Sequence, residues 1–342
     1  MRAIVYTQTG GPDVLSLVQR PLPEPGPGEV RVKLVFAAVN PTDYKTRRGT
    51  APGEPTPFPE VVPGQDGAGL VDATGAGVSG REPGSRVWVW EAGWGRASGT
   101  AAEYVVLPEA HVVPLPDGVG FELGASVGIP ALTAHRCLTV HESGPERLGP
   151  GSLRERTVLV AGGAGAVGNA AIQLAVWAGA RVITTVSSPE KADLARRAGA
   201  HHVVNYRRDD AAGALARLAP AGVDLVVEVS PATNAALDAT VLAPDGVVAV
   251  YANNGGDEVS LPVRAHMVGN IRYQFVLVYT VPARAKENAI AAVNAAMAAG
   301  ALRVGVEAGL PLHHFPLAEA TAAHSAVEEA IVGKVLLDIG AG

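Results

Sequence analysis

From Thr157 onward the sequence alternates short apolar runs with alanine-rich amphipathic segments, and this alternation constrains the fold more than any other feature. Helical segments are expected to begin near Ala166, Pro189, Asp210 and Thr233. Strands that alternate with helices are joined by right-handed crossovers, so they form a parallel sheet that helices cover on both faces. The pattern therefore predicts a doubly wound α/β domain whose strands occupy residues 157–161, 181–186, 202–206, 223–229 and 246–251.

The first part of the chain, to about Gly128, has a different texture. Short β-branched segments, separated by clusters of Pro and Gly, indicate an irregular all-β unit with strands at 30–39, 69–71, 86–90 and 103–107. A chain of 342 residues with 48% hydrophobic residues is long enough for two domains with sizeable cores. The two textures therefore predict two domains of different class.

The end of the chain predicts a helix at 283–299, a strand at 311–317, a helix at 320–330 and a strand at 334–339. The segment before them, 271–279, is a sixth strand that is unusually apolar and aromatic for a sheet edge. Edges of that kind are normally covered. A homodimer through residues 271–279 would cover it, and burial by the rest of the same chain is the alternative.

A glycine-rich loop follows the first strand of the α/β part. Gly163, Gly165 and Gly168 have the spacing G-x-G-x-x-G, and Ala166 and Val167 stand where the helix begins. Glycines permit a tight turn and close approach of the backbone to a pyrophosphate, and the helix N-terminus offers free N–H groups. The loop predicts a dinucleotide-binding site, against the alternative of a purely structural turn.

The end of the second strand favours NADPH over NADH. An NAD-dependent enzyme usually has an acid there to bind the ribose 2′-hydroxyl, whereas this chain has Ser187 and Ser188, followed by Lys191. Tyr206, which follows the third strand, could close the same phosphate pocket. Glu190 is the observation that points the other way.

Composition excludes several classes of function. The net charge of −6, from 27 basic and 33 acidic residues, gives no reason to expect a nucleic-acid partner. Cys137 is the only cysteine, so the chain can form no intramolecular disulfide and no zinc site with two or more thiolates. Neither a signal-peptide pattern nor a membrane-length apolar run is found, so we expect a cytoplasmic protein with no membrane partner.

Seven segments carry a family resemblance: AAVNPTDYKTRRG, VPGQDGAGLV, GTAAEYVVLP, GIPALTAHRCL, the glycine loop, the region around YANNGG, and HSAVEEAIVGKVLL. In order along essentially the whole chain, they resemble the zinc-free quinone oxidoreductase and zeta-crystallin branch of the medium-chain dehydrogenase/reductase superfamily. The resemblance implies a GroES-like catalytic β domain, from residues 1–128 and 280–342, around a Rossmann NADPH-binding domain of residues 129–279, with the active site between them.

Zinc-dependent members of that superfamily carry a Cys where this chain has Asn40, and a His-Glu pair where it has Gln65 and Asp66. Neutral amide oxygens are poor ligands for zinc compared with thiolate or imidazole. The resemblance therefore implies an enzyme without catalytic zinc, whose substrate stabilises its own anion.

The same resemblance suggests roles for individual residues. Asn40 would donate a hydrogen bond to the substrate oxygen, Tyr44 would be the nearby phenol that delivers a proton, and Asp43 would fix Arg47 or the backbone. The cofactor-binding residues carried over by resemblance are Thr133 beside the nicotinamide, Asn253 in the loop after the fifth strand, and Lys334 near the cofactor phosphate.

The function expected from these residues is NADPH-dependent reduction of quinones or of conjugated enones and enals by metal-free hydride transfer. Two alternatives stay open. One is an enoyl-thioester reductase, which uses the same fold and chemistry, and the other is an NADPH-binding protein with negligible turnover.

Overall fold

The alternating segments form a parallel sheet, in a computed structural model that describes residues 1–340. Within these residues the sheet has six strands, and every neighbouring pair is parallel. The strand order is β10-β9-β8-β11-β12-β13, with β8 at Thr157–Ala161, β9 at Arg181–Val186, β10 at His202–Asn205, β11 at Val223–Glu228, β12 at Leu242–Val250 and β13 at Arg272–Phe275. The doubly wound sheet predicted from the sequence is confirmed.

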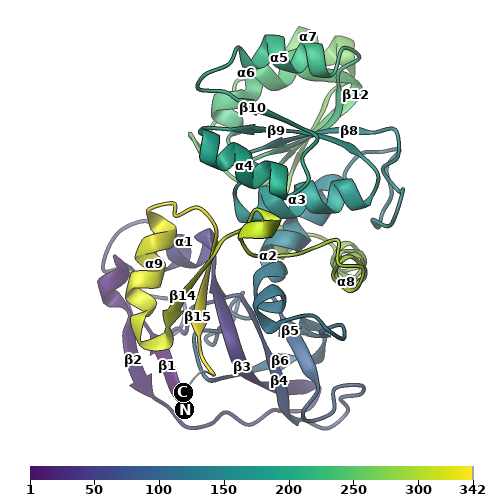
Figure 1. Ribbon diagram of the computed structural model, residues 1–342. Coiled ribbons are helices and arrows are strands. Elements are labelled where there is room, and N and C mark those ends of the chain that lie inside the picture. The colour runs from purple at the N-terminus through teal and green to yellow at the C-terminus, as the bar shows by residue number, and fades with distance from the viewer. Residues whose placement is uncertain (341–342) are drawn as a thin grey trace. The chain divides into compact units, whose positions relative to one another are not determined.

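Helices cover both faces of this sheet. Helices α3 (Ala166–Trp177) and α4 (Pro189–Arg197) lie on one face, and α5 (Ala211–Leu218) and α6 (Pro231–Val241) on the other (Figure 1). The further helices of this part are α7 (Val263–Gly269) and α8 (Ala283–Ala298). Helix α5 begins one residue after Asp210 because the Asp210 side chain caps it, accepting a hydrogen bond from the Gly213 amide at 3.1 Å.

The sixth strand is shorter than expected. It covers only Arg272–Phe275, and the rest of the predicted segment continues into the short helix η3 (Val278–Thr280). The chain turns there because Val278 and Tyr279 are buried, with 4% and 6% of their surface exposed. Val276 is buried as well, so the apolar character of Val276, Val278 and Tyr279 reflects packing within the same chain. Phe275 and Leu277 remain exposed.

A mostly antiparallel sheet forms the other part of the chain. In the described residues its order is β14-β15-β3-β4-β5-β7, with β6 also paired to β3, and Figure 1 shows β15 beside β3. Its strands are β3 (Glu29–Val39), β4 (Asp66–Thr74), β5 (Arg86–Val89), β6 (Tyr104–Pro108), β7 (Val112–Pro114), β14 (Leu312–Pro316) and β15 (Lys334–Asp338). A two-stranded ribbon and three helices complete it: β1 (Arg2–Val5), β2 (Ser16–Gln19), α1 (Pro41–Arg48), α2 (Phe121–Leu138) and α9 (Ala320–Glu328).

Short 3₁₀ helices occur at Pro12–Val14 (η1), Glu109–His111 (η2), Val306–Ala308 (η4) and Leu317–Glu319 (η5). Trp88 is fully buried, and Trp90 stacks on His111 with ring centroids 4.6 Å apart. Both tryptophans are therefore part of the core of the β unit. No helix within residues 1–340 is both long and apolar enough to cross a membrane.

The chain divides into two units, Met1–Ile129 with the segment from Leu312 onward, and Pro130–Pro311. The first boundary falls inside α2, next to the expected one, but residues 280–311 belong to the second unit and not to the GroES-like domain as expected. Side chains of α3 hold this segment. Asn169 Nδ2 donates to the Ala308 carbonyl at 2.8 Å, and Gln173 Nε2 donates to the Arg303 carbonyl at 3.0 Å.

Candidate functional site

The glycine loop of the second unit packs too tightly for side chains at two of its predicted glycines. A Cβ added at Gly163 would lie 2.2 Å from Thr184 Oγ1, and one added at Gly168 would lie 2.4 Å from the Gly162 carbonyl oxygen. The loop therefore lies directly against β9 and α3. Gly162 itself has φ +71°, which favours glycine, and the sequence motif did not assign it.

Gly165 differs from the other glycines of the loop. It is the N-cap of α3, and an added Cβ would meet nothing nearer than the Gly162 carbonyl oxygen at 3.5 Å. The first turn of α3, which starts at Ala166 and Val167, contains no acidic residue. Open space in front of a helix N-terminus with no competing carboxylate suits the pyrophosphate of a dinucleotide, so the residues present fit that group.

The predicted 2′-phosphate residues come together at the end of β9. Lys191 Nζ donates to Ser187 Oγ at 3.2 Å, and the Lys191 amide donates to Ser188 Oγ at 3.3 Å, which caps α4. The Tyr206 amide donates to the Val186 carbonyl at 3.1 Å, so the backbone of Tyr206, whose side chain is half exposed, lies next to the residue before Ser187. A hydrogen bond with Ser188 lowers the pKa of the exposed Glu190 carboxyl, so a negative charge also lies here.

Asn253 lies in the loop after β12, at the same edge of the sheet. Its side-chain amide donates to Asp257 Oδ1. The neighbouring Asn254 is tied to the end of β11, because its amide donates to the Val229 carbonyl at 3.1 Å and its carbonyl accepts from Ser230 Oγ at 2.7 Å. The loops after β8, β9, β11 and β12 thus meet at the carboxyl edge, where ligands of doubly wound folds bind.

A buried pair of carboxyl groups that the motifs did not indicate lies at the end of β11. Glu228 Oε1 accepts hydrogen bonds from the Ser230 amide at 2.5 Å and from Asn234 Nδ2 at 3.0 Å. Asp238 of α6 is 1% exposed, and burial together with the charge of Glu228 raises its pKa to about 8. The pair therefore shares a proton at neutral pH. A glutamate directly after the apolar run Leu225–Val227, at the end of a strand, was the signal available in the sequence.

In the first unit, three predicted or neighbouring residues form a buried hydrogen-bonded chain. Lys334 Nζ donates to Asn40 Oδ1 at 2.5 Å, and Asn40 Nδ2 donates to Asp66 Oδ2 at 2.7 Å. None of the three residues is more than 2% exposed. Lys334, expected near a cofactor phosphate, instead contacts the amide that was expected to serve the substrate. The reason is the antiparallel pairing of β15 with β3, in which Val335 lies opposite Val39.

Asp66 is held at this place by α2. The Ile129 amide donates to Asp66 Oδ1 at 2.9 Å, and a Cβ at Gly128 would lie 2.2 Å from the same oxygen. Burial raises the pKa of Asp66 to about 6, and the Lys334 charge opposes that rise. Burial also lowers the pKa of Lys334. A carboxyl group with the pKa of Asp66 is mostly ionised at neutral pH.

The Asp43 side chain binds the backbone amide of Asn40. Its Oδ2 accepts from the Asn40 amide at 2.7 Å, at the start of α1. Burial raises the pKa of Asp43 to about 7, and the Asp66 charge adds to the rise. The expectation that Asp43 fixes Arg47 or the backbone thus resolves to the backbone, because Arg47 instead forms an ion pair with Glu328 at 2.7 Å.

Tyr44 and Thr133, the remaining predicted residues, are not part of the hydrogen-bonded chain of Lys334, Asn40 and Asp66. The half-buried Tyr44 ring lies under the guanidinium of Arg48, and the Arg48 Cζ atom is 5.5 Å from the centroid of the ring. Thr133 is buried in α2, within the second unit. Asn40 does not fit a zinc ion, because a neutral amide oxygen is a poor zinc ligand and Lys334 Nζ already lies on this oxygen. Among residues 1–340, no cluster of three or more His, Cys, Asp or Glu residues could hold a metal ion.

Models of known protein families match both units. Residues 26–117 match the alcohol dehydrogenase GroES-like domain, and residues 166–295 match the zinc-binding dehydrogenase family. The chain is 31% identical to the quinone oxidoreductase of Lama guanicoe over 98% of this chain and 97% of the relative.

Solved structures agree with the same fold. A structure described as an NAD-dependent alcohol dehydrogenase is 32% identical and superposes with a TM-score of 0.85 over 99% of this chain and 100% of the other. A mycobacterial protein in complex with NADPH is also 32% identical, with a TM-score of 0.80 over 98% of this chain and 99% of the other. The two names point to different nicotinamide cofactors.

The Glu228–Asp238 pair should make stability depend on pH. Folding raises the pKa of Asp238 from 3.8 to about 8, so the free energy of unfolding falls as pH rises between these values. Asp238→Asn keeps an N–H donor for Glu228 but carries no titrating proton. We expect urea unfolding at about pH 8 to show a gain of about 1–3 kcal/mol over the wild type, with a smaller difference at about pH 4.

Asp193→Asn is the matched control, because the Asp193 side chain is 70% exposed on α4. It should change stability little at either pH. If Asp238→Asn shifts stability equally at both pH values, the carboxyl pair does not share a proton.

Proposed function

Since the chain belongs to the medium-chain dehydrogenase/reductase superfamily, in its quinone oxidoreductase and zeta-crystallin-like branch, we propose that it reduces quinones or conjugated enones and enals with NADPH. The protein is an NAD(P)-dependent oxidoreductase with a GroES-like domain and a Rossmann domain. The single observation that carries the metal-free proposal is the Lys334 ammonium on Asn40 Oδ1, in the position where zinc-dependent relatives have a metal-binding cysteine.

The chemistry of the proposed substrates matches this site. A bound nicotinamide supplies the hydride, and a quinone or enone delocalises the negative charge that develops on its own oxygen. The protein then has to orient the substrate and donate a hydrogen bond to that oxygen. Asn40 has two N–H bonds, of which Asp66 accepts one, so the other is the donor that we assign to the substrate.

The cofactor would be held by the carboxyl edge of the Rossmann sheet. The pyrophosphate is assigned to the loop of Gly163, Gly165 and Gly168 with the start of α3. The 2′-phosphate is assigned to Ser187, Ser188, Lys191 and Tyr206, which supports NADPH. Thr133 and Asn253 are assigned to the nicotinamide half.

The proposed activity predicts that the protein oxidises NADPH in the presence of phenanthrenequinone or cyclohexenone. The oxidation is measured as the loss of absorbance of the reduced nicotinamide. The reaction should continue at an unchanged rate after dialysis against EDTA, because the proposal assigns no zinc to Asn40, Gln65 and Asp66. No oxidation with either compound, in protein that binds NADPH tightly, would contradict the proposed function. A rate that falls with EDTA and returns with zinc would contradict its metal-free form.

The assigned phosphate pocket predicts a selective effect of Lys191→Ala. Removing the ammonium should weaken NADPH binding roughly ten- to hundredfold, as expected for a hydrogen bond to a charged group. Binding of NADH should change little, because NADH has no 2′-phosphate. Titration of cofactor fluorescence measures both, with Lys33→Ala on the exposed face of β3 as the control. Equal losses for the two cofactors would show that the phosphate lies elsewhere.

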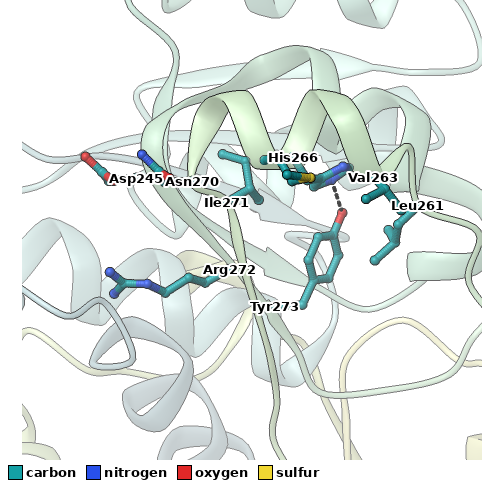
Figure 2. Close-up of a pocket in the computed structure, with 9 residues that line it drawn as sticks. Asp245, Leu261, Val263, His266, Asn270, Ile271, Arg272 and Tyr273 are labelled. Atoms are coloured by element: carbon teal, nitrogen blue, oxygen red, sulfur yellow. Dashed lines mark hydrogen bonds between the residues drawn. The ribbon is translucent and has the colours of Figure 1, made fainter.

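We also assign a homodimer to the edge of the Rossmann sheet. In the part of the chain that the structure describes, β13 pairs only with β12, so its outer backbone groups are open. Exposed apolar residues lie in and near this edge, and Figure 2 shows α7 beside β13, with Tyr273 hydrogen-bonded to His266 at 3.2 Å. An open strand can pair with the same strand of a second copy across a two-fold axis. The exposed apolar residues here are Val263, Met267, Val268, Phe275 and Leu277.

A charge at this edge should separate the dimer. Leu277 is 51% exposed, and we expect Leu277→Glu to shift the mass measured by light scattering from dimer to monomer. Val306→Glu is the matched control, because Val306 is 52% exposed in η4, and it should leave the mass unchanged. A wild-type protein that is monomeric at micromolar concentration would contradict the assignment.

A further inference from the structure

Lys334 is unusual because it is a buried lysine whose ammonium contacts a neutral amide. It is 2% exposed, and its Nζ donates a hydrogen bond to Asn40 Oδ1 rather than to a carboxylate. Asp66 and Asp43 act on it by charge alone. A buried ammonium requires compensation, which the nearby carboxyl groups of Asp66 and Asp43 supply.

Two side chains, Lys334 and Asp66, fix the orientation of the Asn40 amide. An ammonium can only donate, so it must face Oδ1, and an ionised carboxylate can only accept, so it must face Nδ2. Lys334 and Asp66 therefore exclude the flipped amide from both sides. The direction of the second Asn40 N–H follows from this arrangement.

We propose that Lys334 is a positioning residue of the reductase, which acts through Asn40 by orienting its amide and making the remaining N–H a stronger donor to the substrate oxygen. The inference rests on the proposed function and deepens it. A positive charge on the carbonyl oxygen draws electrons from the amide nitrogen, because the C–N bond has partial double-bond character. Hydrogen bonds in a chain strengthen one another in this way, most of all in a dry interior.

Burial separates this role from phosphate binding. A lysine that met a cofactor phosphate would direct its ammonium to the ligand, whereas Lys334 Nζ is 2.5 Å from Asn40 Oδ1. The antiparallel pairing of β15 with β3 places Lys334 directly beyond the Val335–Val39 pair, next to Asn40. The position is thus determined by the sheet and does not depend on a ligand.

The inference is tested with Lys334→Gln and Lys334→Met, assayed with NADPH and phenanthrenequinone. Gln keeps a neutral donor to Asn40, whereas Met has a similar length and no donor. We expect kcat to fall roughly ten- to hundredfold in the Met variant, and less in the Gln variant, while the dissociation constant of NADPH stays unchanged. A loss of NADPH affinity that exceeds the loss of NADH affinity, with kcat retained, would instead assign Lys334 to the phosphate.

A double-mutant cycle separates positioning from a general structural effect. If Lys334 acts through Asn40, Lys334→Gln should lower kcat in the wild type but not in an Asn40→Ala background. Equal losses in both backgrounds would overturn the proposal. Lys33→Met on the exposed face of β3 is the control and should leave kcat unchanged. The Gln variant retains a polar donor, so the cycle remains available if the Met variant fails to fold.

Failure of the proposed function would be seen separately, as a wild-type protein without turnover on any quinone or enone. The inference is then decided by the Asn40 side-chain amide signals in the NMR spectrum, assigned by their loss in Asn40→Ala. These signals should shift markedly in Lys334→Gln, because the cation on Oδ1 is gone, and should not change in Lys33→Met. Unchanged Asn40 signals in Lys334→Gln would overturn the contact and the proposal.

Discussion

The polar centre of the first unit depends on the fully buried carboxylate of Asp66. A buried charge of this kind costs several kcal/mol unless hydrogen bonds and an opposite charge compensate it. Asp66 obtains both, from the Ile129 amide, Asn40 Nδ2 and the nearby Lys334. The start of β4, the middle of α2 and the junction of β3 with α1 are thereby tied at one point. The absence of a side chain at Gly128 is what lets α2 approach so closely.

In the second unit the buried carboxyl groups of Glu228 and Asp238 are stabilised in another way. No lysine or arginine is among the groups that determine the pKa of Glu228 and Asp238, and a shared proton takes the place of an opposite charge. The consequence is mechanical as well as electrostatic. Glu228 also accepts from Ser230 and Asn234, so the pair fastens the start of α6 to the end of β11. The loop that carries Asn253 is anchored to the same place through Ser230.

The features that the sequence predicted well are local ones. The predicted bounds of β8 and β9 and the predicted start of α3 agree with the structure. An apolar run and a glycine loop are determined by neighbouring residues in the chain, so the sequence pattern is sufficient to locate them. The group of Ser187, Ser188 and Lys191 was also predictable, since a strand end and the next helix turn are adjacent in the chain. Residues 303–308 were misplaced because their anchors, Asn169 and Gln173, lie far away in α3.

The contact of Lys334 with Asn40 shows the same limit most clearly. The two residues are 294 positions apart, and only the pairing of β15 with β3 brings them together. Motif reasoning could place each residue in a family pattern, but it could not show that one determines the orientation of the other. A resemblance transfers roles one residue at a time, whereas the hydrogen bonds between residues depend on the fold.

The exchange of a metal ion for an ammonium has a chemical consequence for the proposed reaction. A zinc ion binds an oxyanion directly and stabilises a full negative charge on it. An ammonium that is already bound to an amide oxygen reaches the substrate only through the amide, and a single neutral N–H stabilises charge far less. The substrate itself then has to supply the stabilisation of negative charge that the zinc ion would otherwise give. Quinones and conjugated enones spread the developing charge over a π system, so the metal-free site that we propose would favour them over simple ketones and aldehydes.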